Sequence, residues 1–171
     1  GRDQAILLET IEGADHEQDL RADALERLLG REERRPQLEG RHLLIEGREK
    51  SCFAVTEPNA GLDTTRITTK AVRHGETYAV SGQKIWISTA QVAHKMLLLA
   101  RTAEADPKAP ARGLSLFYTD FDRSRIEVRE IDKHGRKAVD SNQLFIDGLE
   151  IPVEDRIGEE GRGFEYILHG M

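Results

Sequence analysis

The chain has few of the residues that define several classes of protein. Its 171 residues include one cysteine, Cys52, which excludes an internal disulfide and favours a reducing compartment. The six histidines show no metal-ligand spacing, and a lone thiol does not support a zinc site. No apolar run reaches the length of a membrane-spanning helix, and no signal-peptide pattern opens the chain. We therefore expect neither a metal site nor a membrane span.

Positive charge is scarce relative to negative charge. The chain carries 25 Lys and Arg against 31 Asp and Glu, a net charge of −6, with no long basic tract. This balance disfavours binding of nucleic acid through a broad cationic face. The sequence holds no Gly-x-Ser-x-Gly elbow and no P-loop. The glycine string of 158–163 contains two glutamates that would repel phosphate, so we interpret it as a flexible joint.

The character of the chain changes near residue 50. Residues 1–50 are rich in charge, and Asp15 with Gln18 resembles a capping box that opens a predicted helix over 15–30. Residues 5–11 predict a shorter helix. The chain opens with Gly1 rather than Met, which indicates a processed, tagged or fragmentary chain. From residue 51 onward the sequence is typical of β structure.

Short runs of strand-forming residues follow one another from residue 51, separated by turn residues. The predicted strands are 52–56, 67–72, 77–81, 84–88, 95–101, 114–119, 126–130 and 143–146, with turns at Ser81-Gly82 and Asp147-Gly148 among others. No helices intervene to connect parallel strands. We therefore predict a mainly β fold, an antiparallel β-barrel or orthogonal sandwich of about seven to eight strands. We also predict a helical N-terminal segment and a C-terminal helix that starts at Phe164 and is cut short.

Residues 52–63 are the most informative run. Strand formers from Phe53 to Thr56 stop at Glu57-Pro58, and a turn then passes through Gly61 to Asp63. Backbone N–H groups freed at the end of the strand, beside a threonine hydroxyl and a glycine that admits close approach, can bind a flat polar ligand.

This run resembles the signature of the acyl-CoA dehydrogenase family, flavoenzymes that desaturate acyl thioesters. Four further stretches resemble the family in the same order: 82–88, 140–145, 151–153 and 157–164. The resemblance covers about residues 51–171. It implies the family's middle β-domain over 51–160 and the start of its C-terminal helical domain over 161–171, and it leaves residues 1–50 as a helical or irregular segment of uncertain identity.

The resemblance implies that FAD is the cofactor. The backbone of the signature strand would supply donors to the flavin, Gly61 would admit it closely, and the Trp-Ile-Ser stretch would flank it. Carried over, the cofactor-binding residues are Phe53, Ala54, Val55, Thr56, Gly61, Leu62, Trp86, Ile87 and Ser88.

Each of these residues also has a plainer structural interpretation. Phe53 and Val55 share a side of the strand and can form its inward face, Trp86 can be a core aromatic, and a strand-end hydroxyl is an ordinary role for serine. The spacing of two predicts that Trp86 and Ser88 share one face of a strand. Glu57 and Asp63 we interpret as structural carboxylates rather than acid–base groups.

Two residues are candidates for substrate contact. Leu62 departs from the family, which usually has Ser or Thr there, and it offers no side-chain hydrogen bond. Arg112, beside a loop rich in proline and alanine, is a candidate for a CoA phosphate; a solvated surface arginine is the plainer interpretation.

The reaction that the resemblance implies is α,β-desaturation of an acyl-CoA, with hydride transfer to flavin N5. The family's base is a glutamate of the C-terminal helical domain, so we name no catalytic residue here and expect this chain alone to be catalytically incomplete. Acyl-CoA, an electron-transferring flavoprotein and a second copy of the chain, in a homodimer or homotetramer, are the implied partners. The implied location is bacterial cytoplasm or mitochondrial matrix.

Two other readings remain open. The first is an acyl-CoA oxidase or flavin monooxygenase of the same fold, and the second is a cofactor-free β-barrel interaction module.

Overall fold

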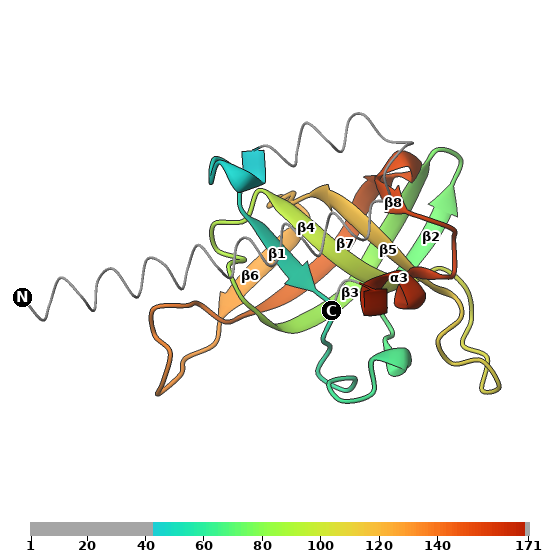
Figure 1. Cartoon of the computed structure of the whole chain (residues 1–171), viewed down its shortest axis with the longest axis horizontal. Helices are drawn as coiled ribbons and strands as arrows, with labels where there is room; N and C mark the ends of the chain where they lie inside the picture. Colours follow the sequence, from blue (N-terminus) through green and yellow to red (C-terminus); the bar gives the residue numbers. More distant parts are fainter. Residues whose placement is uncertain (1–42, 170–171) are drawn as a thin grey trace, which may run out of the picture.

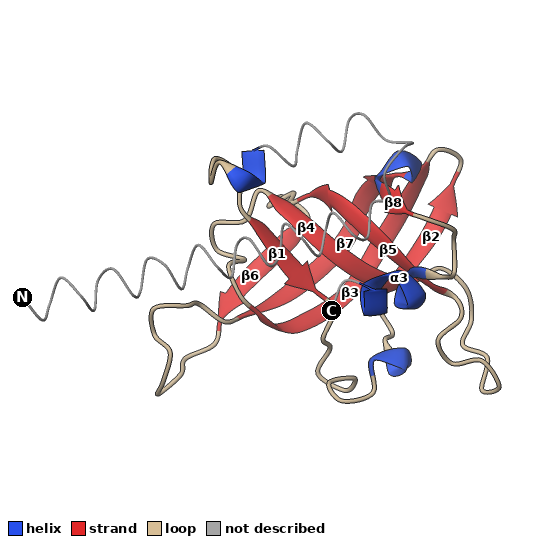
Figure 2. Ribbon diagram, viewed as in Figure 1, coloured by secondary structure: helices blue, strands red, loops and turns tan. Residues whose placement is uncertain are grey.

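The computed structural model describes residues 43–169 and confirms a mainly β protein (Figures 1 and 2). The helices predicted over 5–11 and 15–30 lie outside the described residues. The strands are β1 (Ser51–Ala54), β2 (Lys70–His74), β3 (Thr77–Ile87), β4 (Lys95–Arg101), β5 (Leu114–Asp120), β6 (Ile126–Glu130), β7 (Asn142–Pro152) and β8 (Arg156–Ile157). Two 3-10 turns, η1 (Thr64–Arg66) and η2 (Val153–Asp155), and the C-terminal helix α3 (Gly163–His169) accompany them. Residues 43–45 are also helical.

All eight strands belong to one mixed sheet with the order β6-β7-β3-β2-β4-β5-β8, and β1 pairs with β4. The β1–β4 and β2–β4 pairs are parallel, whereas the sequence predicted antiparallel pairing throughout. Parallel neighbours require a long connection, and the whole β2–β3 hairpin supplies it between β1 and β4. The sheet ends at β6 and β8 and is not closed into a barrel.

Two predicted turns are bulges inside long strands. Val80 pairs with Leu149 and Gly82 with Ile146, so one residue of β3 opposes two residues of β7. Gly148, with φ +60°, takes the left-handed conformation that this bulge needs. The turn chemistry at Ser81-Gly82 and Asp147-Gly148 is real, but the chain does not reverse because strand pairing continues on both sides.

Two apolar clusters lie on opposite faces of the central strands. One contains Met96, Leu98 and Phe117, and the other contains Leu97, Leu99 and Leu116 together with Ile167 of α3. Helix α3 packs against β5, as Figure 1 shows, and confirms the predicted C-terminal helix. Because both faces are covered, the side chains of β4 and β5 are almost continuously buried.

The observed strand boundaries agree with the predicted ones for some strands and differ for others. β4 and β6 have the predicted bounds, whereas β1 ends two residues early and β2 begins three residues late. Within residues 43–169 no helix has the length and apolar character needed to cross a membrane.

Candidate functional site

The signature turn lies beside the end of β3. The Ile85 N–H donates to the carbonyl of Thr56 over 2.9 Å, which joins the exit of β1 to the residue before Trp86. Among the described strands only β4 pairs with β1, so the other edge of β1 has no strand paired with it. The β1–β2 loop hangs from the sheet at the bottom of Figure 1. The two stretches that the sequence analysis assigned to one ligand are therefore neighbours.

Three large apolar side chains of this region face solvent. The exposed fractions are 44% for Phe53, 58% for Trp86 and 108% for Leu62. The structure excludes the plainer interpretations of the first two: Trp86 is not a core aromatic, and Phe53 is not on the inward face, which Cys52 and Ala54 occupy. Apolar side chains gathered at a surface commonly mark a binding site.

The strand that was expected to carry Trp86 and Ser88 on one face is irregular, because a bulge interrupts β3 at Trp86 and the strand ends at Ile87, before Ser88. Lys84 pairs with Leu144 and Ile87 pairs with Asn142, so two residues of β3 oppose one residue of β7 and the alternation breaks. Trp86 has φ +63° and Thr89 has φ +68°, both in the left-handed region. Each such residue costs on the order of 1–3 kcal/mol, and such strain concentrates at functional sites.

Two side chains from the start of β7 hold this strained segment. Asn142 Nδ2 donates to the Ile87 carbonyl over 2.9 Å, and the Thr89 N–H donates to Asp140 Oδ1 over 2.7 Å. Asn142 Nδ2 also donates to Asp140 Oδ2 over 2.5 Å. Burial alone would raise the pKa of Asp140, but hydrogen bonds from Asn142, Thr89 and Gln91 lower it overall. The sequence analysis quoted Asp-Ser-Asn as part of the resemblance and gave it no role.

A buried ion pair lies beneath the turn. Lys84 Nζ is 3.0 Å from Glu57 Oε1, and the two side chains are 0% and 5% exposed. Glu57 also accepts the N–H and hydroxyl of both Thr68 and Thr69, over 2.5–2.9 Å. The structural interpretation of Glu57 is thereby confirmed, and Lys84 is a residue that the sequence analysis missed.

Burial and pairing act in opposite directions on this pair. Burial raises the pKa of Glu57, but the Lys84 charge and the threonine hydrogen bonds lower it to about 2. Burial lowers the pKa of Lys84 to about 8 although the Glu57 charge raises it. Both groups are therefore predominantly charged at neutral pH.

Arg101 connects the signature loop to the loop before β5. Its Nη2 donates to the Thr65 carbonyl over 2.7 Å, its Nε to Ile67 over 3.0 Å and its Nη1 to Arg112 over 3.2 Å. Asp63 accepts the Thr65 N–H over 3.2 Å and caps η1, which confirms its structural interpretation. The signature turn is thus held by hydrogen bonds from Arg101 and to Asp63, in addition to the buried Lys84–Glu57 pair.

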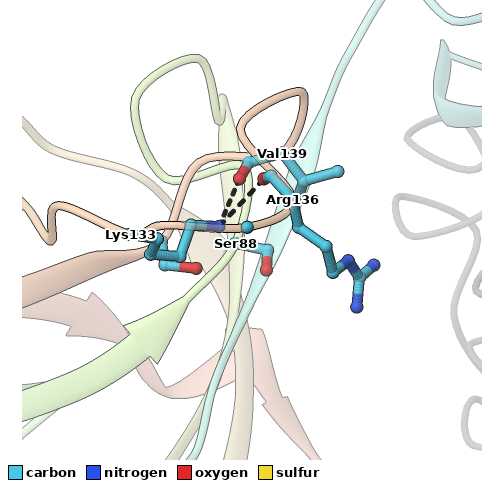
Figure 3. A pocket seen from close by; sticks show the side chains of 6 residues that line it. Ser88, Lys133, Arg136 and Val139 are labelled. Carbon is cyan, nitrogen blue, oxygen red and sulfur yellow. Dashed lines mark hydrogen bonds between the residues drawn. The ribbon is translucent and has the colours of Figure 1, made fainter.

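Ser88 lines a pocket of about 420 Å³ (Figure 3). The other lining residues belong to the β6–β7 loop: Lys133, Gly135, Arg136, Val139 and Ser141. Lys133 Nζ donates to the carbonyls of Val139 over 2.5 Å and Arg136 over 3.2 Å, so its ammonium holds the loop's own backbone. Trp86 is not among the residues that line this pocket.

The remaining candidates differ in what they can offer a ligand. Ala54 and Ile87 are buried, so only their backbone can contribute. At Gly61 an added Cβ would meet no protein atom within 4 Å, so the space beside it is open. Arg112 is exposed and lies 3.6 Å from Glu165 Oε1. In the described part of the chain no group of three His, Cys, Asp or Glu side chains could hold a metal ion.

Comparison with known sequences gives a consistent family. The family model described as "Acyl-CoA dehydrogenase, middle domain" matches residues 52–149. Cyclohex-1-ene-1-carbonyl-CoA dehydrogenase of Syntrophus aciditrophicus (strain SB) is 34% identical over 122 residues, which cover 71% of this chain and 29% of that protein. The mitochondrial long-chain specific acyl-CoA dehydrogenase of Mus musculus is 32% identical over 121 residues, 70% of this chain and 28% of that protein.

Solved structures agree. The acyl-CoA dehydrogenase of Geobacillus kaustophilus superposes with a TM-score of 0.70 at 33% identity, over 75% of this chain and 34% of that one. A prolyl acyl carrier protein oxidase superposes with a TM-score of 0.73 at 27% identity, over 80% of this chain and 36% of that one. The chain thus spans about a third of the length of these relatives. With more than half of its residues matched by the family's middle-domain model, the chain belongs to the acyl-CoA dehydrogenase family.

Proposed function

We propose that the protein carrying this chain is an FAD-dependent acyl-CoA dehydrogenase, and that residues 53–63 and 86–88 form one wall of its flavin site. The observation that carries the proposal is the hydrogen bond between Ile85 and Thr56, which brings the two stretches together. Exposed Phe53 and Trp86 beside them provide the apolar surface that a flavin ring requires.

The residues present fit this cofactor. The side of β1 that no described strand covers can present peptide N–H groups to the polar edge of the ring. The open space at Gly61 admits a ligand close to the backbone. Ala54 and Ile87 would contribute through their backbone alone, since their side chains are buried.

Bound FAD would accept the hydride from the β-carbon of the acyl group. The part of this chain would be to orient the ring and shield it from water, and alignment of this kind is a large part of catalysis. The base that takes the α-proton would come from the C-terminal helical domain, as in the family. We assign no catalytic residue in this chain and expect it to be inactive alone.

The substrate class is an acyl-CoA thioester. Leu62, fully exposed in the signature turn, would contact the substrate through its backbone and an apolar side chain rather than through the hydroxyl usual in the family. We keep Arg112 as a weaker candidate for a CoA phosphate because the exposed Glu165 carboxylate already neighbours it.

The proposed assembly follows the family. Residues 51–160 would be the middle β-domain and 161–171 the start of the C-terminal helical domain. A homodimer or homotetramer would complete the site, an electron-transferring flavoprotein would accept the electrons, and the compartment would be bacterial cytoplasm or mitochondrial matrix.

Absorbance spectroscopy of the purified protein tests the proposal. The expected result is a visible flavin absorption band that bleaches under anaerobic conditions when acyl-CoA is added. Rapid oxygen consumption during turnover would instead indicate an oxidase or monooxygenase. A colourless full-length protein that takes up no added FAD would overturn the proposal and favour an interaction module.

The chain offers a second assay because Trp86 is its only tryptophan. Added FAD should quench the Trp86 emission, whereas ADP, which lacks the ring, should not. Equal effects of the two ligands would contradict a flavin site beside Trp86.

A further inference from the structure

Lys84 is an unusual residue to find in the interior of a sheet. It is fully buried in β3, two residues before Trp86. Lysine is almost never buried completely unless its charge is paired and its donors are satisfied. Here Nζ donates to three acceptors: Leu99 O over 2.7 Å, Glu57 Oε1 over 3.0 Å and Val55 O over 3.1 Å.

These acceptors lie on different segments. Leu99 belongs to β4, whereas Val55 and Glu57 flank Thr56 at the exit of β1. The next residue of β3, Ile85, donates its N–H to the Thr56 carbonyl. Consecutive residues of β3 therefore hold consecutive carbonyls of the signature run, directly before the strained Trp86.

The carboxylate of Glu57 extends the connection to the far end of the turn. It accepts two hydrogen bonds from Thr68 and two from Thr69, where the chain enters β2. Both ends of the 58–67 loop are thus fixed to the same ammonium group through one carboxylate. An apolar side chain could fill the same volume, but it could not hold these carbonyls and N–H groups in place.

We propose that the Lys84–Glu57 pair is a positioning device that sets the separation between the signature turn and Trp86, and so the shape of the wall against which the flavin lies. The inference rests on the proposed function for the identity of the ligand. Lys84 is fully buried and the Glu57 side chain is only 5% exposed, so they would act through the backbone that they hold and are positioning residues.

The test uses two substitutions and a matched control. Lys84→Met keeps the length of the side chain and removes its charge. The Glu57→Gln/Lys84→Met double variant removes both charges, so that no buried charge is left unpaired, and it is the variant to use if the single one does not fold. Lys95→Met is the control, because Lys95 is also a strand lysine paired with a carboxylate, Asp120, but is partly exposed.

Two readouts follow positioning rather than stability. The first is the dissociation constant for FAD, which we expect to rise by at least about tenfold in the folded double variant and to stay within about twofold in Lys95→Met, since small misplacements of a site carry effects of this size. The second is iodide quenching of the Trp86 emission without ligand, which reports how the indole is seated. We expect it to change in both Lys84 variants and not in the control.

The outcomes separate the inference from the function on which it rests. If the folded double variant binds FAD as tightly as the wild type and its iodide quenching is unchanged, the positioning role is overturned. The flavin assignment is then left intact. No FAD binding by the wild type overturns the flavin assignment, and iodide quenching then decides by itself whether the pair seats Trp86.

Discussion

The centre of the sheet and the signature turn differ in the burial of their side chains and in the strain of their backbone. β4 and β5 are buried on both faces, and their side chains pack without strained backbone. Around the turn, Phe53 and Trp86 face solvent, and Trp86 and Thr89 adopt left-handed backbone conformations. Strain and exposure of this kind are expected where a ligand, rather than the protein's own core, completes the structure. We therefore expect the first region to contribute most to stability and the second, as proposed, to bind the ligand.

The largest expected effect is that of a substitution in the centre of the sheet. Phe117→Ala should lower the free energy of unfolding by about 3–5 kcal/mol, because a fully buried aromatic leaves a cavity. The ring of Phe117 is 0% exposed and packs edge-on against Tyr78, with centroids 5.0 Å apart. Urea unfolding measures the loss. Phe53→Ala, in the exposed region, should lower the free energy of unfolding much less. Equal losses in the two variants would contradict the difference between the two regions.

A pH titration of stability tests the ion pair that joins the two regions. The folded pKa of Glu57, about 2, lies below its ordinary value of 4.5, so the unfolded state binds more protons in acid. The resulting stabilisation, about 3 kcal/mol, is complete above about pH 5 and is lost as the pH falls towards 2. Glu57→Gln should lack this dependence, so its unfolding free energy should approach that of the wild type in acid. Parallel curves for the two proteins would refute the linkage.

An intermediate effect is expected where the sheet supports the strained segment. Asp140→Ala removes the acceptor of the Thr89 N–H and of the buried Asn142 amide, and should cost about 1–3 kcal/mol in unfolding free energy. It should also raise the iodide quenching of Trp86. Asp122, which accepts the N–H and hydroxyl of Ser124 on an exposed turn, is the matched control. A loss no larger in Asp140→Ala than in Asp122→Ala would remove the supporting role.

The smallest expected effect is a gain in stability for glycine over alanine at position 86. Trp86→Gly relieves a left-handed conformation with φ +63°, whereas Trp86→Ala retains it. The glycine variant should therefore be more stable than the alanine variant by about 1 kcal/mol, while both lose affinity for FAD. Chemical denaturation and a flavin titration followed by absorbance measure the two quantities. An alanine variant as stable as the glycine variant would show that position 86 carries no strain.

Features of the fold and of the candidate site were predictable where the residues that determine them lie close together in the sequence. β4 and β6 have the predicted bounds because their apolar patterns are complete within the strand. The family resemblance was readable because its motifs are short and follow in order, and the family model's match to residues 52–149 bears it out. The flavin-site residues themselves remain predictions, now with a geometry that brings residues 56 and 85 together.

What failed depended on partners far along the chain. Gly148 looks like a turn glycine, and only the pairing of its neighbours Ile146 and Leu149 with β3 makes the position a bulge. Spacing alone predicted one regular strand through Trp86 and Ser88, whereas a bulge opposite Gln143 interrupts the strand and it ends at Ile87. Lys84 carried no local signal, because its acceptors lie 15 to 29 residues away.

The amino-acid sequence by itself determined the mainly β class, the family and the two stretches expected to meet a flavin, since each rests on residue type and local order. Only the tertiary structure decided the parallel pairing of β1 with β4, the outward position of Trp86 and the burial of Lys84. Those features arise from contacts between distant segments. The free energy of such contacts depends on which backbone groups meet in space, and no local pattern encodes it.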